Sequence, residues 1–397
     1  MDDKGVNKIP RNVLMLGLVS LFNDIASEMI YPVIPIFLTT VLGAPVAIVG
    51  LIEGVAEATA SLGKYFFGAL SDSKGKRKPF VVAGYSASTI AKGMMGLAIG
   101  WPFVLFARFL DKIGKGLRTA PRDSMLLQNT THENRGFIFG FHRSLDSLGA
   151  VIGPLLALVL LSLFHDNIRL MFFAAFIPSA LAVLFLILFI REKKISQSTS
   201  SHVFIKINWS TLSPRLRIFT IVSVLFALGN SSDAFLLLRA KNLGLTTTLV
   251  VLTYVLYNVS QAAFATPMGI VSDKLGPRKV FALGLIIFSL VYFFFGWTSS
   301  SSLLWILFPL YGIYIAATDG VSKAYISTFI SEKESGTYFG AYYTLTAVAT
   351  FFASLVGGYL WSTLGPSSTF YYGSILSFSA FILFSFYREN ARRSFGK

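Results

Sequence analysis

The sequence predicts an all-α membrane protein with about twelve transmembrane helices, and three observations lead to that fold class. Of its 397 residues, 54% are hydrophobic and 13% are charged, whereas a soluble domain carries about 25% charged residues to cover its surface. Apolar runs of about 20 residues recur along the chain, each long enough to cross a hydrocarbon core of ~30 Å as a helix. Ten-residue segments of alternating hydrophobicity, typical of membrane strands, are absent. The helices therefore use nearly the whole chain and leave no room for a sizeable soluble domain.

The expected helices follow one another through short loops. The first apolar stretch, from Val13 to about Leu42, contains no small-residue cleavage site, so it is expected to be a retained helix and not a signal peptide. The expected spans are 12–41, 46–70, 79–100, 102–127, 136–164, 169–190, 216–241, 246–271, 279–298, 302–328, 337–363 and 368–387.

The basic residues predict the orientation of these helices. The formal net charge is +15, and with a cytoplasmic N-terminus most of it falls in inside segments, such as the cluster at 74–78, the linker at 191–217 and the tail. Only Arg169, Arg239 and Lys241 fall outside. This is the asymmetry that the positive-inside rule requires. We therefore expect a multi-pass protein of the cytoplasmic (inner) membrane with both termini in the cytoplasm, in contact with membrane lipids and not with nucleic acid.

The chain is an internal repeat with an offset of about 200 residues. The expected domains are an N-terminal six-helix bundle at 1–190, a polar cytoplasmic linker at 191–217 and a C-terminal six-helix bundle at 218–397. Two pseudo-symmetric bundles place a cavity on the axis between them, where rocking can alternate access. Because both halves lie in one chain, we expect a monomer.

The loop after the second helix carries the most specific motif, and it occurs twice. Its members are Gly68, Asp72, Gly75, Arg77 and Lys78, and then, with the same spacing, Gly269, Asp273, Gly276, Arg278 and Lys279. This pattern resembles the Gly-x-Leu-x-Asp-x-x-Gly-x-Arg-Lys loop of the major facilitator superfamily, and the resemblance spans the chain. It implies the fold of that superfamily and a gating role for the loops. From the residues themselves, Gly68 permits close helix packing and Gly75 a tight turn; the basic positions equally suit a role in topology.

The fifth helix contains Gly149, Gly153 and Pro154 in the order Gly-x-x-x-Gly-Pro. The two glycines allow close packing and the proline a kink. The segment is similar to a motif of the antiporter branches of the superfamily, which favours export; ordinary helix packing is the alternative.

Acidic residues at membrane depth are costly and usually functional. Asp24 and Glu28 are four residues apart and share one face of the first helix. Together with Glu57 and Asp146 they are the candidates for binding a proton, which is the expected coupling ion. The alternative is a buried ion-pair network that holds the helices together.

Basic residues concentrate on the fourth helix. Arg108, Asp111, Lys115 and Arg118 lie on it, with Asp111 able to pair with Lys115, and Arg143 follows on the fifth helix. Lys115, Arg118 and Arg143 could attract an anionic cargo. The superfamily often has an arginine here with glycine four residues later, whereas Arg108 is followed by glycine after six and eight residues. The second half offers only Asn230 and Asp233 on the seventh helix as further candidates.

The expected function is secondary active transport of a small organic solute by alternating access, coupled to protons and directed towards export of an anionic or amphiphilic compound. No cofactor is expected. The four histidines show no metal-ligand spacing, so no metal site is predicted. Proton-coupled uptake of an organic acid, a siderophore or a metal ion is the alternative. An intramembrane lipid-modifying enzyme is a remote one, because the sequence lacks a zinc motif and a nucleophile with its base. We therefore expect that the protein is not an enzyme.

Overall fold

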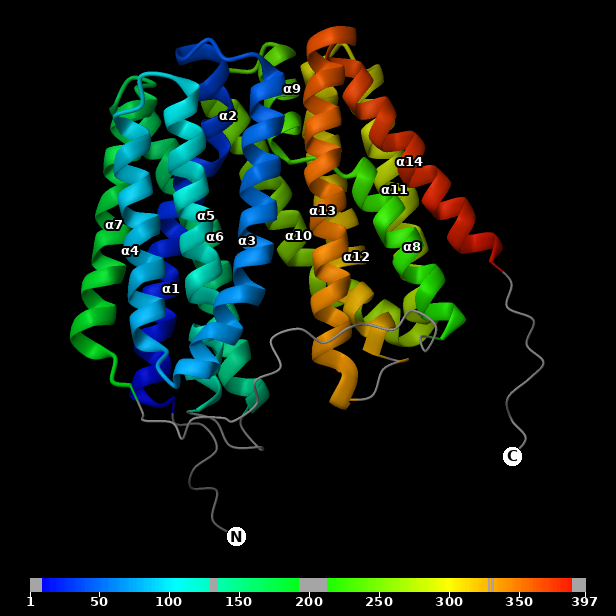
Figure 1. Ribbon diagram of the computed structural model, residues 1–397. Helices are drawn as coiled ribbons and strands as arrows, with labels where there is room; N and C mark the ends of the chain where they lie inside the picture. Colours follow the sequence, from blue (N-terminus) through cyan, green and yellow to red (C-terminus); the bar gives the residue numbers. More distant parts are fainter. Residues whose placement is uncertain (1–8, 129–134, 193–212, 328, 330–331, 388–397) are drawn as a thin grey trace, which may run out of the picture. The chain divides into compact units, whose positions relative to one another are not determined.

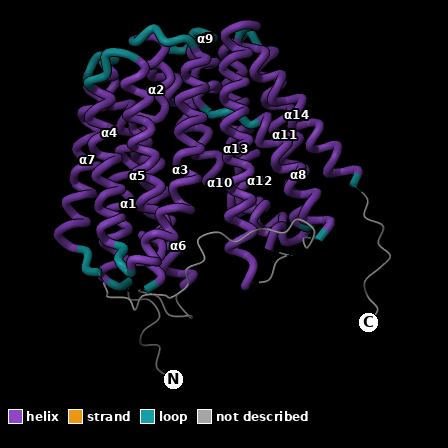
Figure 2. Tube along the Cα trace, viewed as in Figure 1, coloured by secondary structure: helices purple, strands orange, loops and turns teal. Residues whose placement is uncertain are grey.

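The computed structural model describes residues 9–128, 135–192, 213–327, 329 and 332–387. Within these ranges almost every residue is helical and no strand occurs (Figures 1 and 2). Ten helical segments of the described chain are long and apolar enough to cross a membrane. Two further predicted spans, 79–100 and 102–127, overlap the helices α4 (Lys78–Gly96) and α5 (Trp101–Leu127), which carry more polar and charged side chains. The prediction of an all-helical membrane protein of about twelve spans is confirmed.

The chain forms two compact units. The first comprises the described residues within Met1–Phe204 together with Asp233–Asn258, and the second those within Ile205–Ser232 and Val259–Lys397. The helices of the first half are α1 (Arg11–Ile30), η1 (Tyr31–Val33), α2 (Ile34–Ile36), η2 (Phe37–Val41), α3 (Val46–Lys74), α4 (Lys78–Gly96), α5 (Trp101–Leu127), α6 (Arg135–Leu163) and α7 (Ile168–Phe189). Those of the second half are α8 (Pro214–Gly229), α9 (Ala234–Asn242), α10 (Thr247–Leu275), α11 (Pro277–Trp297), η4 (Ser301–Leu303), α12 (Leu304–Ser327), α13 (Glu332–Leu364) and α14 (Pro366–Phe386).

The first span changes helix type along its length. After α1, residues Tyr31–Val33 form a 3₁₀ turn and Phe37–Val41 a π-helical turn. Pro32 and Pro35 lie in this stretch, and each removes a backbone N–H that a regular α-helix would use. The span is therefore continuous in helicity but irregular at its end.

The predicted span 216–241 is present as Pro214–Asn242, but it is not one continuous helix, because the chain breaks there into α8 and α9. Asn230 leaves the helical region with ψ of 80°, and its side chain donates to the Tyr314 hydroxyl at 3.1 Å. The Ser232 N–H donates to the Ser354 hydroxyl at 3.2 Å. Asn, Ser and Asp side chains compete with the helical backbone for hydrogen bonds, so the polar stretch 230–233 ends one helix and begins the next. The break falls where the chain passes from the second unit to the first.

Glycines set how closely α5 packs against its neighbours. A Cβ placed on Gly114 would lie 2.4 Å from the Gly84 carbonyl oxygen of α4, and one on Gly116 would lie 2.7 Å from the Gly63 Cα of α3. Real Cβ atoms do not approach backbone so closely, so only glycine fits at these contacts. As a result α5 is held between α3 and α4 with its charged side chains at fixed depths.

Candidate transport site

A compensated cluster of buried charges joins α3, α4 and α5 in the first unit. One Arg108 nitrogen donates to both carboxylate oxygens of Glu53, at 2.7 and 2.9 Å. Asp111 lies 3.8 Å from the Lys92 ammonium and 3.8 Å from the Arg108 guanidinium. Lys92, Arg108 and Glu53 are all buried. Two carboxylates thus face two cations, which is the arrangement a buried ion network requires.

The expected pairing of Asp111 with Lys115 is wrong. Asp111 turns towards α4 and Lys92, whereas the Lys115 side chain is exposed. Lys92 was not among the predicted residues, although it is the one charged residue within 79–100. A lone charge inside an apolar span is costly without a partner, so its position was the signal that could have identified it.

The glycines of α6 lie directly against the acidic face of α1. A Cβ on Gly149 would lie 2.9 Å from the Asp24 Cβ, and one on Gly153 would lie 2.9 Å from the Glu28 Cβ. The expected close approach at this motif is therefore present, and Pro154 lies inside α6 directly after it. Small residues at such crossings let backbones come together in membranes. The consequence is that Asp24 and Glu28 are fixed at a helix seam.

Asp24 and Glu28 differ from the compensated cluster in that neither forms an ion pair with a described residue. Asp24 is within electrostatic range of Asp146, Arg118 and Arg122. Glu28 accepts a hydrogen bond from the Tyr254 hydroxyl at 2.7 Å, a contact within the first unit. Carboxylates without a bound cation are the ones that can gain and lose a proton at modest cost.

Asp146 lies one helical turn before Gly149 on α6, beside a histidine. The His142 Nδ1 is 3.5 Å from an Asp146 carboxylate oxygen, and His142 is buried. The two side chains therefore form a polar pair on α6, next to the α1 seam.

The cations of α5 divide into bound and uncompensated groups. Arg122 donates to the Ser20 hydroxyl at 2.8 Å and pairs with Asp123 at 2.9 Å. Arg118 is buried, donates to the Ser88 hydroxyl at 2.5 Å and lies 4.7 Å from the Tyr85 ring centroid, without an ion pair among the described residues. The Lys115 ammonium likewise has no described carboxylate bound. Arg118 and Lys115 thus retain positive charge that an anion could use.

The remaining predicted residues are placed as follows. Glu57 is exposed on α3 and forms no ion pair with a described residue. Asn230 donates to Tyr314 in the second unit, whereas Asp233 accepts from the Tyr257 hydroxyl at 3.0 Å in the first. Arg143 belongs to α6, but its side chain lies outside the described part of the structure.

The motif loops act as helix caps inside their own units. Gly75 and Gly276 have φ of 61° and 89°, so both turns need the left-handed conformation that glycine adopts freely. Lys78 donates to the carbonyl oxygens of Ile187 and Ile190 at the end of α7, at 3.1 and 2.6 Å. Arg278 donates to the corresponding carbonyls at the end of α14 (Phe384 and Tyr387, at 2.9 and 2.7 Å). Cations at helix C-termini satisfy the last carbonyls and the helix dipole.

The other residues of the repeated motif make fewer contacts with neighbouring helices. Gly68 packs against Ala120 of α5, where a Cβ would lie 3.0 Å from the alanine side chain, whereas a Cβ on Gly269 would meet nothing within 4 Å. Arg77 donates to the Ser124 carbonyl at 3.1 Å, and Lys279 is exposed. The side chains of Asp72 and Asp273 lie outside the described part of the structure.

A helical membrane protein with charges fixed at its helix seams fits a carrier of small solutes better than an enzyme. Within the described ranges no three His, Asp or Glu side chains gather as a metal ion would require. The family model described as Major Facilitator Superfamily matches residues 16–238 and 218–396. The chain belongs to this family, and it is a transporter.

A relative along nearly the whole chain agrees with this assignment. An uncharacterized MFS-type transporter of Methanocaldococcus jannaschii is 34% identical over 386 residues, which is 96% of this chain and 95% of that protein. The multidrug resistance protein MdtG of Salmonella schwarzengrund is 28% identical over 152 residues, or 38% of this chain and 37% of that one. The solved structure of a POT family transporter in complex with 5-aminolevulinic acid has a TM-score of 0.79 over 97% of both chains, with 13% identity. At that identity the likeness concerns the fold alone.

Proposed function

We propose that this transporter exports an anionic or amphiphilic organic solute in exchange for protons. It acts as a monomer in the cytoplasmic membrane, with both termini in the cytoplasm and the bundles 1–190 and 218–397 rocking about the linker. No cofactor takes part; the proton is the coupling ion. The partial similarity to a multidrug resistance protein and the Gly-x-x-x-Gly-Pro segment of α6 support export over uptake.

One observation carries this proposal: the charges of the first unit separate into two sets. Glu53, Asp111, Arg108 and Lys92 neutralise one another and are structural. The second set has no counter-ion bound among the described residues. It consists of two carboxylates (Asp24 and Glu28) and two cations (Arg118 and Lys115). Uncompensated carboxylates suit proton binding, and uncompensated cations suit an anionic cargo.

The uncompensated cations and the uncompensated carboxylates are electrostatic neighbours. Arg118 is an electrostatic neighbour of Asp24, and Lys115 is one of Glu28. Because these groups act on one another electrostatically, binding of an anion at the cations and binding of a proton at the carboxylates change each other's free energy without direct contact.

The first test is a thermal-stability screen of the purified protein against anionic, cationic and neutral metabolites and drugs at two pH values. A ligand at about 100 times its Kd stabilises the folded state by ~2.7 kcal/mol. We expect anions to stabilise the protein, and Arg118→Ala to remove the effect. Lys323→Ala is the matched control, because Lys323 is an exposed cation paired with Asp319 on the surface of α12. Stabilisation by cations alone contradicts the anionic cargo.

Coupling and direction need a second measurement, in proteoliposomes loaded with a stabilising anion. Asp24→Asn and Glu28→Gln should each abolish flux driven by a pH gradient while preserving exchange of labelled for unlabelled anion. Gradient-driven flux that persists in the double variant rejects these carboxylates as the proton site. If the anion moves across the membrane in the same direction as the protons, antiport is rejected.

A further inference from the structure

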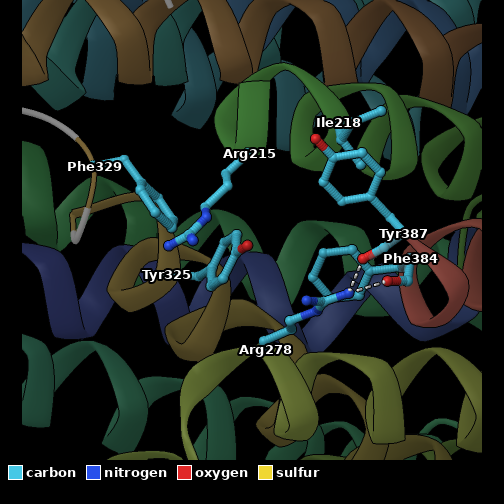
Figure 3. A pocket seen from close by; sticks show the side chains of 7 residues that line it. All are labelled: Arg215, Ile218, Arg278, Tyr325, Phe329, Phe384 and Tyr387. Carbon is cyan, nitrogen blue, oxygen red and sulfur yellow. Dashed lines mark hydrogen bonds between the residues drawn. The ribbon is translucent and has the colours of Figure 1, made fainter. Parts of the chain in front are cut away.

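A basic, aromatic pocket lies within the second unit. Its volume is about 380 Å³, and it is lined by Arg215, Ile218, Arg278, Tyr325, Phe329, Phe384 and Tyr387. The helices α8, α11, α12 and α14 all contribute to it. Figure 3 shows the two arginine side chains reaching into the same hollow, with the aromatic rings around them.

The pocket marks the depth at which apolar spans end. Arg215 and Arg278 are each the second residue of an apolar span, Pro214–Asn242 and Pro277–Trp297. Two other spans end at Lys323 and Phe386; Tyr325 lies two residues after the first and Tyr387 directly after the second. Lipid headgroups lie at this level of a membrane, and Tyr side chains and cations are enriched there. A hollow at this depth therefore faces headgroups.

The Arg278 guanidinium has donors left over. One of its nitrogens, Nη2, serves both helix-end carbonyls, and its carbon lies 5.4 Å from the Phe384 ring centroid. Its Nε and Nη1 donate to no described residue. The cap fixes the guanidinium in place, so the remaining donors are pre-organised for an acceptor with several oxygens. Arg215, at the start of α8, adds a second cation, and the N-terminal end of this 16-residue helix adds favourable dipole.

The corresponding cap of the first unit is lined differently. A hollow of about 480 Å³ there is lined by Lys78, Pro79, Val82, Ala83, Ile187 and Glu192, so it has one cation and a carboxylate in place of two arginines. Tyr325 follows Met125 by 200 residues, the offset that also relates Gly284 to Gly84. Tyr387 corresponds to Ile190, since each supplies a carbonyl to its motif-loop cation. Met125 and Ile190 are buried together in one apolar core cluster. Met125 and Ile190 thus pack into an apolar core, whereas the matching Tyr325 and Tyr387 line a cavity with two arginines.

From this geometry we infer that the Arg215–Arg278 pocket binds the phosphate group of an anionic phospholipid. A phosphodiester supplies the oxygens that two guanidinium groups recognise, and the aromatic walls accept the glycerol and the first acyl carbons. Basic pockets between membrane helices bind acidic headgroups for the same reasons. The site is separate from cargo transport, so it does not depend on the function proposed above.

The test is a lipid titration of the purified full-length protein in neutral detergent, with the thermal unfolding midpoint as the measurement. Phosphatidylglycerol, phosphatidylcholine and inorganic phosphate are the three probes. We expect phosphatidylglycerol to raise the midpoint and phosphatidylcholine to have little effect. Arg215→Gln should weaken the apparent affinity for phosphatidylglycerol about tenfold, the loss of one charge-assisted hydrogen bond.

Arg217→Gln is the matched control. Arg217 lies on the same helix, two residues further on, and does not line the pocket, so its removal should leave the titration unchanged. Arg278→Gln should act like Arg215→Gln; if it fails to fold because α14 loses its cap, Arg215→Gln decides alone. Equal affinities in wild type and Arg215→Gln, or equal responses to both lipids, overturn the inference. A full response to inorganic phosphate overturns the lipid as occupant and leaves a simple anion site.

Discussion

The helix pairs α4–α5 and α11–α12 occupy equivalent places in the two units, yet their interiors are chemically opposite. At an offset of 200 residues, Lys92 corresponds to Tyr292, Arg108 to Phe308 and Asp111 to Tyr311. The first pair is held by the compensated ion cluster. The second has aromatic rings instead, with Phe288 stacked on Tyr292 within α11 at 3.9 Å between centroids.

Aromatic contacts also join the two helices. Phe288 of α11 meets Tyr314 of α12 at 4.8 Å, and Tyr292 of α11 meets Tyr311 of α12 at 6.3 Å between centroids. Both pairs keep a small residue at the crossing, Gly84 against Gly114 and Gly284 against Thr318. A close approach at one glycine is therefore shared by the two pairs, and the interior beside it can be either ionic or aromatic. This is why the candidate coupling groups can all lie in one half.

The largest expected effect comes from breaking the ionic half alone. Arg108→Met leaves Glu53 buried without its guanidinium, so the free energy of unfolding should fall by about 3–5 kcal/mol. Phe308→Met at the matched position exchanges one apolar side chain for another and should cost about 1.5 kcal/mol or less. Chemical unfolding in detergent measures both. The double variant Glu53→Met/Arg108→Met should recover most of the loss; a double variant as unstable as the single one shows that the pair is not the cause.

A second substitution tests whether the α1–α6 seam is as tight as the glycines indicate. Gly149→Ala places a methyl group against Asp24 and the α1 backbone, so it should destabilise the protein by about 1–3 kcal/mol and slow gradient-driven flux. Gly269→Ala is the control in the second unit, because its Cβ would meet nothing within 4 Å. There, alanine should be neutral or stabilising by up to about 1 kcal/mol. Equal effects at both sites contradict the seam.

Each half has a buried hydrogen bond between two hydroxyl groups, and removing either one should cost the same stability. The hydroxyls of Thr89 and Ser179 are 2.8 Å apart, and those of Ser289 and Ser374 are 3.2 Å apart, all buried. Thr89→Val and Ser289→Ala should each lower the unfolding free energy by about 1 kcal/mol. If the losses of unfolding free energy in the two variants differ by much more than about 1 kcal/mol, the two hydroxyl pairs are not equivalent.

The smallest effect is expected at the helix cap of the first unit. Lys78→Gln removes the charge at the end of α7 and should cost about 0.3–1 kcal/mol, diminished by salt. Lys76→Gln, two residues earlier and exposed, should cost nothing measurable. A loss of transport without a loss of stability would instead assign Lys78 to gating.

Most of the fold follows from hydropathy and helix punctuation. The predicted span 46–70 lies within α3, and 368–387 overlaps α14 almost completely, because Gly and Pro residues mark their ends. The break between α8 and α9 was not predicted, since apolar residues continue on both sides of it. A polar stretch of four residues looks the same in sequence whether it lines a helix or interrupts one.

The charged residues of the site could be predicted from the sequence, but the ion pairs that they form could not. Asp24, Glu28, Arg108 and Arg118 are visible as charges inside apolar spans. Which of them are neutralised depends on the rotation of helices far apart in sequence, as in the Glu53–Arg108 pair, which is separated by 55 residues. Local spacing even favoured the wrong partner for Asp111.

The hydrogen bond between Glu28 and Tyr254 has a consequence for biosynthesis. It joins residues 226 positions apart, whereas the cap from Lys78 to Ile190 closes over 112. During synthesis the N-terminal bundle can dock α7 on its own, but Glu28 receives its tyrosine only after the first part of the second half has been made. Cutting the gene within the linker codons should therefore give an N-terminal fragment that inserts and folds but lacks a partner for Glu28. Co-expression of the complementary fragment would restore it.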